Sequence, residues 1–222
     1  MDMENVAIGS GSAVQKNSVL RNTYALLSLT MIWSTIMAVV GTMLHIGFGA
    51  YLVLALVGFG LLFATRAFRN SAMGVLMVFL FTGVEGLSLG PVLQAYLHMA
   101  NGAQIIGTAA GLTGVMFLSL SGYALVSRKD FSFLGGFLFA GLIALLVVSL
   151  IGMFFSFPGM YLAISFVSAM IFSGYILYDT SSIINGGETN YIMATVSLYL
   201  DILNLFLALL RIISILSGND RK

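Results

Sequence analysis

Seven long apolar runs, separated by short connectors, most constrain what this chain can fold into. A hydrocarbon core about 30 Å thick is crossed by a helix of about 20 apolar residues. Hydrophobic residues make up 59% of the 222 residues and charged residues only 8%, whereas a soluble domain has about 25% charged residues. So few charges cannot cover a surface that faces water. We therefore expect an all-α, polytopic membrane protein with seven transmembrane helices.

The apolar runs are about twice as long as the strands of a membrane β-barrel and lack their two-residue alternation. The expected spans are Tyr24–Leu44, Ala50–Thr65, Ala72–Leu97, Ala103–Val126, Phe133–Phe155, Met160–Ile184 and Tyr191–Leu216. The second run is short and extends over Phe48–Phe68 if its flanks are included. The expected organisation is a disordered cytoplasmic leader over 1–22, a single seven-helix membrane domain over 23–217 and a short polar tail over 218–222.

Basic residues gather at alternate connectors, which sets the expected orientation because Lys and Arg are retained in the cytoplasm. They are Lys16, Arg21, Arg66, Arg69, Arg128 and Lys129. These residues precede the first span, follow the second and follow the fourth, so the amino terminus is predicted in the cytoplasm. Seven crossings then put the carboxyl terminus outside, whereas a re-entrant last span would return the tail, with Arg221 and Lys222, to the inside.

Net charge and cysteine content exclude several classes of function. The formal net charge is +1 and the chain has no cysteine. A nearly neutral chain gives no reason to expect nucleic acid as a partner, and disulfides, thiolate metal sites and cysteine nucleophiles are excluded. The sequence also has no nucleotide-binding loop, zinc-protease helix motif or nucleophile elbow, so we expect no enzyme. The lipid bilayer is the partner that the composition predicts.

Two carboxylates, Asp179 and Asp201, each stand alone within the last two apolar runs. A charge at that depth costs from about 2.5 to more than 10 kcal/mol, so it is normally paired and functional. The connector Asn185–Asn190 is short, so the carboxylates can approach each other. Two adjacent carboxylates in a low dielectric cannot both ionise cheaply and titrate as a unit. Such a pair suits a proton-operated switch, a site for a hard cation such as Ca²⁺, or a general acid and base.

Polar residues also follow one face of each of the last two spans. In the last span they recur in steps of four and three, which keeps them on one side of a helix. They are Asn190, Ala194, Ser197, Asp201, Asn204, Ala208 and Arg211, and the weaker set in the preceding span is Ser168, Tyr175, Asp179 and Ser182. Such a stripe faces protein or water and not lipid. We therefore expect the last span to be the most enclosed, with Tyr175, Ser197 and Asn204 lining a polar path.

Three further charged residues are candidates for the same region. Glu85 lies at mid-depth in the third span, where it either lines the same cavity or is a protonated Glu bonded to a neighbouring helix. Arg66 and Arg69 lie at the cytoplasmic end of the second span, at the membrane level of Asp179. A basic partner at this level would hold the ionised form of the carboxylate.

Glycines in two spans indicate where helices approach closely. The third span carries Gly83, Gly86 and Gly90, and the fourth carries Gly107, Gly111 and Gly114. Small residues at these spacings let helix backbones come into contact in lipid. We expect close helix packing along both spans.

Three segments together resemble the Bax inhibitor-1 (transmembrane Bax inhibitor motif) family. Phe81–Pro91 reads FTGVEGLSLGP and resembles the family's third-helix motif. Lys129–Gly136 reads KDFSFLGG and resembles the start of its fifth helix. The run from Tyr178 to Asn204 contains YDT, NGGETNY and LYLDILN and resembles the carboxy-terminal signature. The resemblance covers roughly residues 20 to 216 and is greatest to the bacterial YccA-like branch.

The resemblance implies seven helices with the last enclosed by the other six. It also implies a pH-sensitive calcium leak gated by a di-aspartyl sensor, whose two positions match Asp179 and Asp201. The family's Arg latch at the end of the second helix matches Arg66 better than Arg69. Calcium would be the transported or bound ion, held by the two Asp, and no other cofactor is implied. The location implied is the bacterial cytoplasmic (inner) membrane.

Two alternative functions stand beside the leak. The YccA-like branch implies a non-conducting modulator of the membrane protease FtsH. In this function the polar leader would be the segment that the protease engages. An intramembrane aspartyl protease is the remote alternative, because Tyr178-Asp179 fits the first of its two motifs. The second Asp of those enzymes follows Gly-x-Gly, whereas Leu198-Tyr-Leu precedes Asp201 here, and the chain has no Pro after Pro158 for their Pro-Ala-Leu element.

Overall fold

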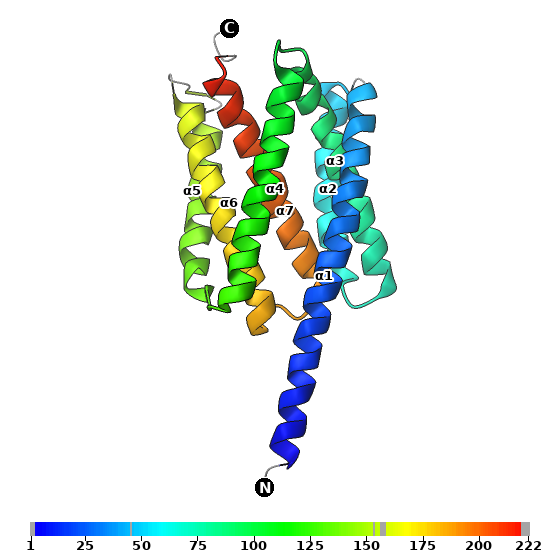
Figure 1. Cartoon of the computed structure of the whole chain (residues 1–222). Helices are drawn as coiled ribbons and strands as arrows, with labels where there is room; N and C mark the ends of the chain where they lie inside the picture. The colour runs from blue at the N-terminus through cyan, green and yellow to red at the C-terminus, as the bar shows by residue number, and fades with distance from the viewer. Residues whose placement is uncertain (1–2, 45, 153, 156–158, 219–222) are drawn as a thin grey trace. The chain divides into compact units, whose positions relative to one another are not determined.

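The computed structural model describes residues 3–44, 46–152, 154–155 and 159–218, with the backbone alone for 3–16 and 48. The described residues form helices joined by short connectors (Figure 1). The elements are α1 (Met3–Met43), α2 (Phe48–Ala67), α3 (Ala72–Leu97), α4 (Gly102–Ser127), the 3₁₀ turn η1 (Ser132–Leu134), α5 (Gly135–Gly152), α6 (Met160–Asn185) and α7 (Tyr191–Leu216).

All seven α-helices are long and apolar enough to cross a membrane, which confirms the expected fold class. Their bounds follow the apolar runs closely because each run is flanked by polar or glycine-containing connectors. The fifth helix is shorter than expected and ends at Gly152. The backbone N–H groups of Phe154 and Phe155 both bond to the carbonyl of Ile151, which closes the chain into a turn there.

The first helix begins earlier than the apolar run that predicts it. Its membrane-length part is Asn17–Met43, yet the helical backbone starts at Met3, inside the segment expected to be a disordered leader. Extending an existing helix costs little compared with starting one, and residues 3–16 contain no proline. The division into leader, membrane domain and tail stays a prediction, and residues 219–222 of the tail lie outside the described residues.

Contacts within the chain define two compact units, which are described one at a time. Unit 1 consists of Met1–Ala95 and Ile183–Ser197, and unit 2 of Tyr96–Ser182 and Leu198–Lys222. Unit 1 therefore holds α1, α2, nearly all of α3 and the first turns of α7. Unit 2 holds α4, α5, most of α6 and the remainder of α7.

Within unit 1, α1 and α3 touch backbone to backbone. A Cβ atom added at Gly86 would meet the backbone carbonyl of Ser34, and one added at Gly90 would meet the backbone of Gly41. A Cβ at Gly41 would in turn lie 2.6 Å from the carbonyl oxygen of Leu87. The expectation of close packing along the third span is confirmed.

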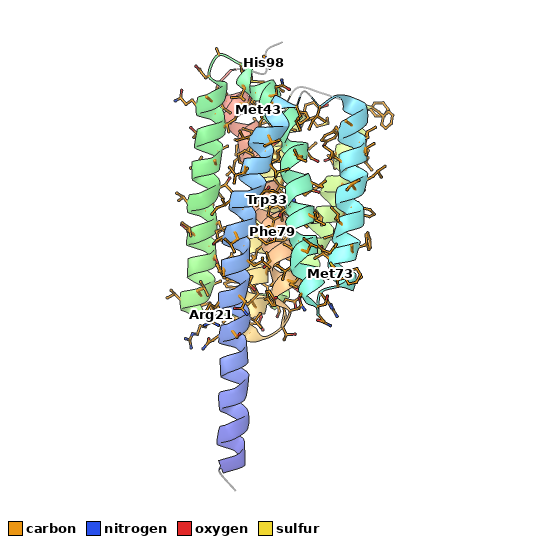
Figure 2. All side chains as sticks on the ribbon, turned by 90° about the vertical axis from the view of Figure 1, so that its right-hand side faces the viewer. Arg21, Trp33, Met43, Met73, Phe79 and His98 are labelled. Carbon is orange, nitrogen blue, oxygen red and sulfur yellow. The ribbon has the colours of Figure 1, made fainter. Side chains whose placement is uncertain are left out.

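The indole of Trp33 strengthens the same contact. Trp33 lies beside Phe79 of α3 (Figure 2), and its Nε1–H donates a 3.0 Å hydrogen bond to the Phe79 carbonyl oxygen. The ring has room because Gly83 has no side chain: a Cβ there would lie 2.7 Å from Nε1. Each glycine of the third-span motif thus makes room for a group on α1.

Within unit 2, α5 and α6 share an apolar core. Leu138, Leu145 and Ile171 are buried together, and Tyr175 and Tyr178 pack against them. Small residues again set the spacing, because a Cβ at Gly174 would lie 2.6 Å from a methyl group of Leu138.

The expectation of close packing along the fourth span is wrong. No atom of the described residues lies within 4 Å of the position that a Cβ would take at Gly107, Gly111 or Gly114. Small size alone therefore does not bring a neighbouring backbone to a glycine.

The last helix is the most buried, as its polar stripe predicts. Of its membrane-length window 56% is buried, whereas no other described helix exceeds 33%. In unit 1 the Thr195 hydroxyl lies 3.3 Å from the carbonyl of Thr23 on α1, and Ile192 packs against Gly74 of α3. In unit 2 α7 contacts α6 through Asp201 and Arg211.

Candidate functional site

The two carboxyl groups of the last helices meet in unit 2. Asp179 is six residues from the end of α6 and Asp201 is ten residues from the start of α7, and their side chains are hydrogen-bonded to each other. Asp201 is buried, with 6% of its surface exposed, and its Oδ2 atom has no hydrogen-bond partner among the described residues. A hydrogen bond between two carboxyl groups requires a proton on at least one of them.

A tyrosine lies next to the pair. The Tyr175 hydroxyl is close enough to interact electrostatically with both Asp201 and Asp179. Its ring packs edge-on against Tyr178, with 6.5 Å between the ring centroids, and Tyr178 covers Gly135 at the start of α5, where a Cβ would lie 3.0 Å from the ring. Both rings also pack against the apolar core that α5 and α6 share.

Two hydroxyl groups fix the segment of α6 that carries Asp179. Thr180 Oγ1 lies 3.3 Å from Ser121 Oγ on α4. The Ser181 hydroxyl donates to the carbonyl of Lys129 at 3.0 Å and accepts from the N–H of Phe131 at 2.9 Å. The connector between α4 and α5 is therefore held to the residues that follow Asp179, which explains why a polar YDTSS run is placed in a membrane helix.

Replacing Ser181 with alanine is expected to destabilise unit 2 by about 1–3 kcal/mol, because it leaves the N–H of Phe131 and the carbonyl of Lys129 without their partner. The hydroxyl is buried, with 1% of the residue exposed, so water cannot replace it. Thermal unfolding in detergent measures the effect. Ser182→Ala is the matched control, since Ser182 has no bond to this connector in the described part of the chain. Equal stability of the two variants would contradict the anchor.

The predicted path residues are distributed over both units. Tyr175 and Asn204 lie in unit 2, where the Asn204 amide donates to the carbonyl of Leu200 at 2.8 Å, and Ser197 lies at the end of the unit 1 segment of α7. Asn190 has a structural role, because its Oδ1 accepts the N–H groups of Ile192 and Met193 at the start of α7. Whether these residues line one path stays a prediction.

The predicted latch arginines and Glu85 belong to unit 1. Arg66 is in the last turn of α2 and Arg69 in the connector that follows, and both are exposed. The carbonyl of Arg69 accepts a 2.9 Å hydrogen bond from Asn190 Nδ2. Glu85 is half-buried against α2. A latch between either arginine and the carboxyl pair therefore stays a prediction.

The donor set limits which ions the carboxyl pair could hold. No group of three or more His, Cys, Asp or Glu side chains gathers among the described residues. Two carboxylates with a tyrosine hydroxyl offer only oxygen ligands, which suit a hard cation such as Ca²⁺. Such a cation would need water or backbone oxygens to complete its coordination.

Sequence reasoning missed two contacts of this region. The polar stripe predicted from helical spacing included Ser182, whereas Ser181 is the residue that bonds α6 to the connector. The run of three hydroxyl residues after Asp179 is the signal that could have indicated Ser181. The guanidinium of Arg211 lies 4.4 Å from the centroid of the Tyr161 ring, at the start of α6. Predicting that contact requires knowing how α6 is aligned along α7, which the sequence alone does not reveal.

Comparison with known proteins places these features in one family. The pattern of the family described as inhibitor of apoptosis-promoting Bax1 matches residues 16–219. A membrane protein of Vibrio cholerae is 49% identical over 208 residues, 93% of each chain. The protein named modulator of FtsH protease YccA in Escherichia coli K12 is 46% identical over 207 residues, 93% of this chain and 94% of its own. Its counterpart in Escherichia coli O6:H1, named inner membrane protein YccA, is equally similar.

Proposed function

The chain belongs to the Bax inhibitor-1 family and is a multi-pass membrane protein, and from this premise we propose that it modulates an FtsH-type membrane protease. The observation that supports the proposal is the 46% identity to the modulator YccA over 93% of this chain. The aligned 207 residues are long enough to include parts of all seven helices, the buried α7 among them. The relative named inner membrane protein YccA supports a location in a bacterial inner membrane. The amino terminus is proposed on the cytoplasmic side because of the Lys and Arg residues in alternate connectors.

A protease assay in proteoliposomes tests the proposal. The chain is reconstituted together with the FtsH protease of the same cell, and the rate of ATP-dependent degradation of a membrane substrate is measured at increasing ratios of chain to protease. We expect the rate to fall several-fold and to level off once the protease is saturated. An unrelated seven-helix protein at the same density is the control for crowding. An unchanged rate at every ratio would overturn the proposal.

Removing residues 1–16 is expected to abolish the effect on the protease. The membrane-length part of α1 begins at Asn17, so the deletion leaves all seven spans in place. The helical backbone before Asn17 continues past α2 and α3 (Figure 1), and its 14 residues, 3–16, extend α1 by about 21 Å at 1.5 Å per residue. A segment of this length outside the membrane is accessible to a protease. A Gly/Ser segment of equal length is the matched control, and full inhibition by the truncated chain would contradict the role of the leader.

A second function is favoured by a different observation, the hydrogen-bonded carboxyl pair. We propose that Asp179 and Asp201 respond to pH and govern a slow leak of calcium or another cation. The pair is enclosed, offers hard oxygen ligands, and leaves Asp201 Oδ2 without a hydrogen-bond partner among the described residues. The two functions are separable, because the deletion of residues 1–16 is expected to leave any cation flux unchanged.

A further inference from the structure

Glu85 is a carboxyl group at the centre of a membrane helix. It lies 12 residues from the nearer end of α3, which is about 18 Å along the helix axis. A charge at that depth is costly, and an intramembrane acid is functional by default. Neither the carboxyl pair of unit 2 nor the proposed modulation of a protease uses it.

The carboxyl of Glu85 lies in a notch on α2. A Cβ atom added at Gly58 would stand 2.6 Å from Glu85 Oε1 and 3.7 Å from a methyl group of Val84. The carboxyl therefore occupies the place that any larger residue at position 58 would take. Gly60, two residues further along the same helix, has nothing within 4 Å of its Cβ position among the described residues.

The helix segments packed around Glu85 in the described part of unit 1 offer no counter-charge. Between Tyr51 and Arg66 the sequence of α2 has no ionisable side chain, and Glu85 is the only one in the unit 1 part of α3, which ends at Ala95. The part of α1 that packs on α3, from Ser34 to Gly41, has none either, and the unit 1 part of α7 contributes only Tyr191 at its first position. The neighbouring hydroxyls of Thr82 and Ser88 donate to carbonyls of their own helix.

The contact with Glu85 lies at one of the two buried positions of the described part of α2. Among the described residues of α2 only Gly58 and Thr65 are buried. An ionised carboxylate at Gly58 would be placed against an apolar helix with no cation beside it, which is costly, whereas a neutral carboxyl is tolerated. The contact between α2 and α3 therefore favours the neutral form of Glu85.

We propose that Glu85 is a proton-binding site that holds α2 to α3: the protonated carboxyl lies in the notch at Gly58, and loss of the proton releases α2. The ligand is a proton. The site is distinct from the carboxyl pair because it lies in the other unit and acts on a different helix.

Infrared spectroscopy of the protein in lipid tests the protonation. The C=O stretch of a neutral carboxyl group is separate from the bands of carboxylates and amides. At neutral pH we expect Glu85→Gln to remove one such band, whereas the control Glu188→Gln, in the connector before α7, should leave that band in place. If Glu85→Gln removes a carboxylate band instead, the proposal is overturned. Glu85→Asp is the second variant. It keeps the carboxyl group but holds it one methylene further from Gly58, so the C=O band of the neutral carboxyl should remain at a shifted frequency.

Amide hydrogen exchange tests the release of α2. After correction for the intrinsic pH dependence, we expect exchange in α2 of the wild type to accelerate several-fold at the pH where the neutral carboxyl band disappears, and to stay constant in Glu85→Gln. Gly58→Ala should displace the carboxyl and accelerate exchange in α2 at neutral pH, whereas Gly60→Ala should leave it unchanged. Identical exchange in the two glycine variants, or a pH response of α2 that survives Glu85→Gln, would overturn the proposal.

Discussion

Replacing Gly90 with leucine is expected to lower the free energy of unfolding by about 3 kcal/mol or more. Overpacking usually costs about 1–3 kcal/mol, and the upper end applies here because no rotation of the new side chain removes the clash. A Cβ at Gly90 already meets the backbone of Gly41, so α1 and α3 have to separate to admit any side chain. The movement would also break the hydrogen bond from Trp33 to the Phe79 carbonyl. We expect the midpoint of thermal unfolding in detergent to fall by roughly 10 °C.

The fluorescence of Trp33 provides the measurement, because the chain has 1 Trp and it lies at this contact. Gly111→Leu is the matched control: it adds the same side chain to another membrane helix, at a glycine with nothing within 4 Å of its Cβ position among the described residues. Gly111→Leu should unfold at the temperature of the wild type. Equal losses in the two variants would show that the leucine itself, rather than the α1–α3 contact, causes the damage.

Replacing either Asp179 or Asp201 with asparagine is expected to remove most of the pH dependence of calcium flux into proteoliposomes. Asparagine keeps a hydrogen bond between α6 and α7 but cannot titrate. In the wild type, full deprotonation would place two charges side by side, and at 4 Å and an effective dielectric near 20 their repulsion is about 4 kcal/mol. A repulsion of that size is enough to change the contact between the two helices, and a single carboxylate does not generate it.

The flux is measured as a function of pH for the wild type and for each variant at equal protein density. Asp130→Asn is the control, because Asp130 lies outside the membrane helices and its Oδ1 accepts the N–H of Ser132 at 2.8 Å, which an asparagine oxygen can also do. This variant should keep the wild-type profile. If the profile survives in both Asp179→Asn and Asp201→Asn, the sensor is elsewhere, and Glu85 is the next candidate.

Helix number and position were predictable from the sequence because the thickness of the membrane fixes the length of a span. The seven apolar runs and the helices agree closely, and the polar stripe of the last span indicated correctly which helix is most buried. The approach of Asp179 and Asp201 was also predictable, since a short connector makes their helices neighbours and lipid would leave either carboxylate without a partner.

The remaining features depend on which faces of the helices meet. Gly86 and Gly111 have the same small size within spaced glycine patterns, but only Gly86 lies against a neighbouring backbone. Helical spacing likewise predicted a role for Ser182, whereas Ser181 bonds to the Lys129 carbonyl. The two residues are adjacent, and their side chains differ in direction by about 100° around the helix. Gly58 gave no signal of its own, because its significance comes from a carboxyl on another helix.

The backbone contact between α1 and α3 also bears on how the protein is made. The ribosome delivers α1 first, and chains generally fold in the order of their synthesis. The glycines that receive Ser34 and Gly41 belong to α3, so α1 cannot complete its packing until α2 has been inserted and α3 has followed. The first helix therefore stays in the bilayer, or beside the insertion machinery, with the surface that packs on α3 uncovered until α3 is inserted. Codon usage and insertion rate across α2 and α3 should consequently affect the yield of folded protein more than the same changes across α5.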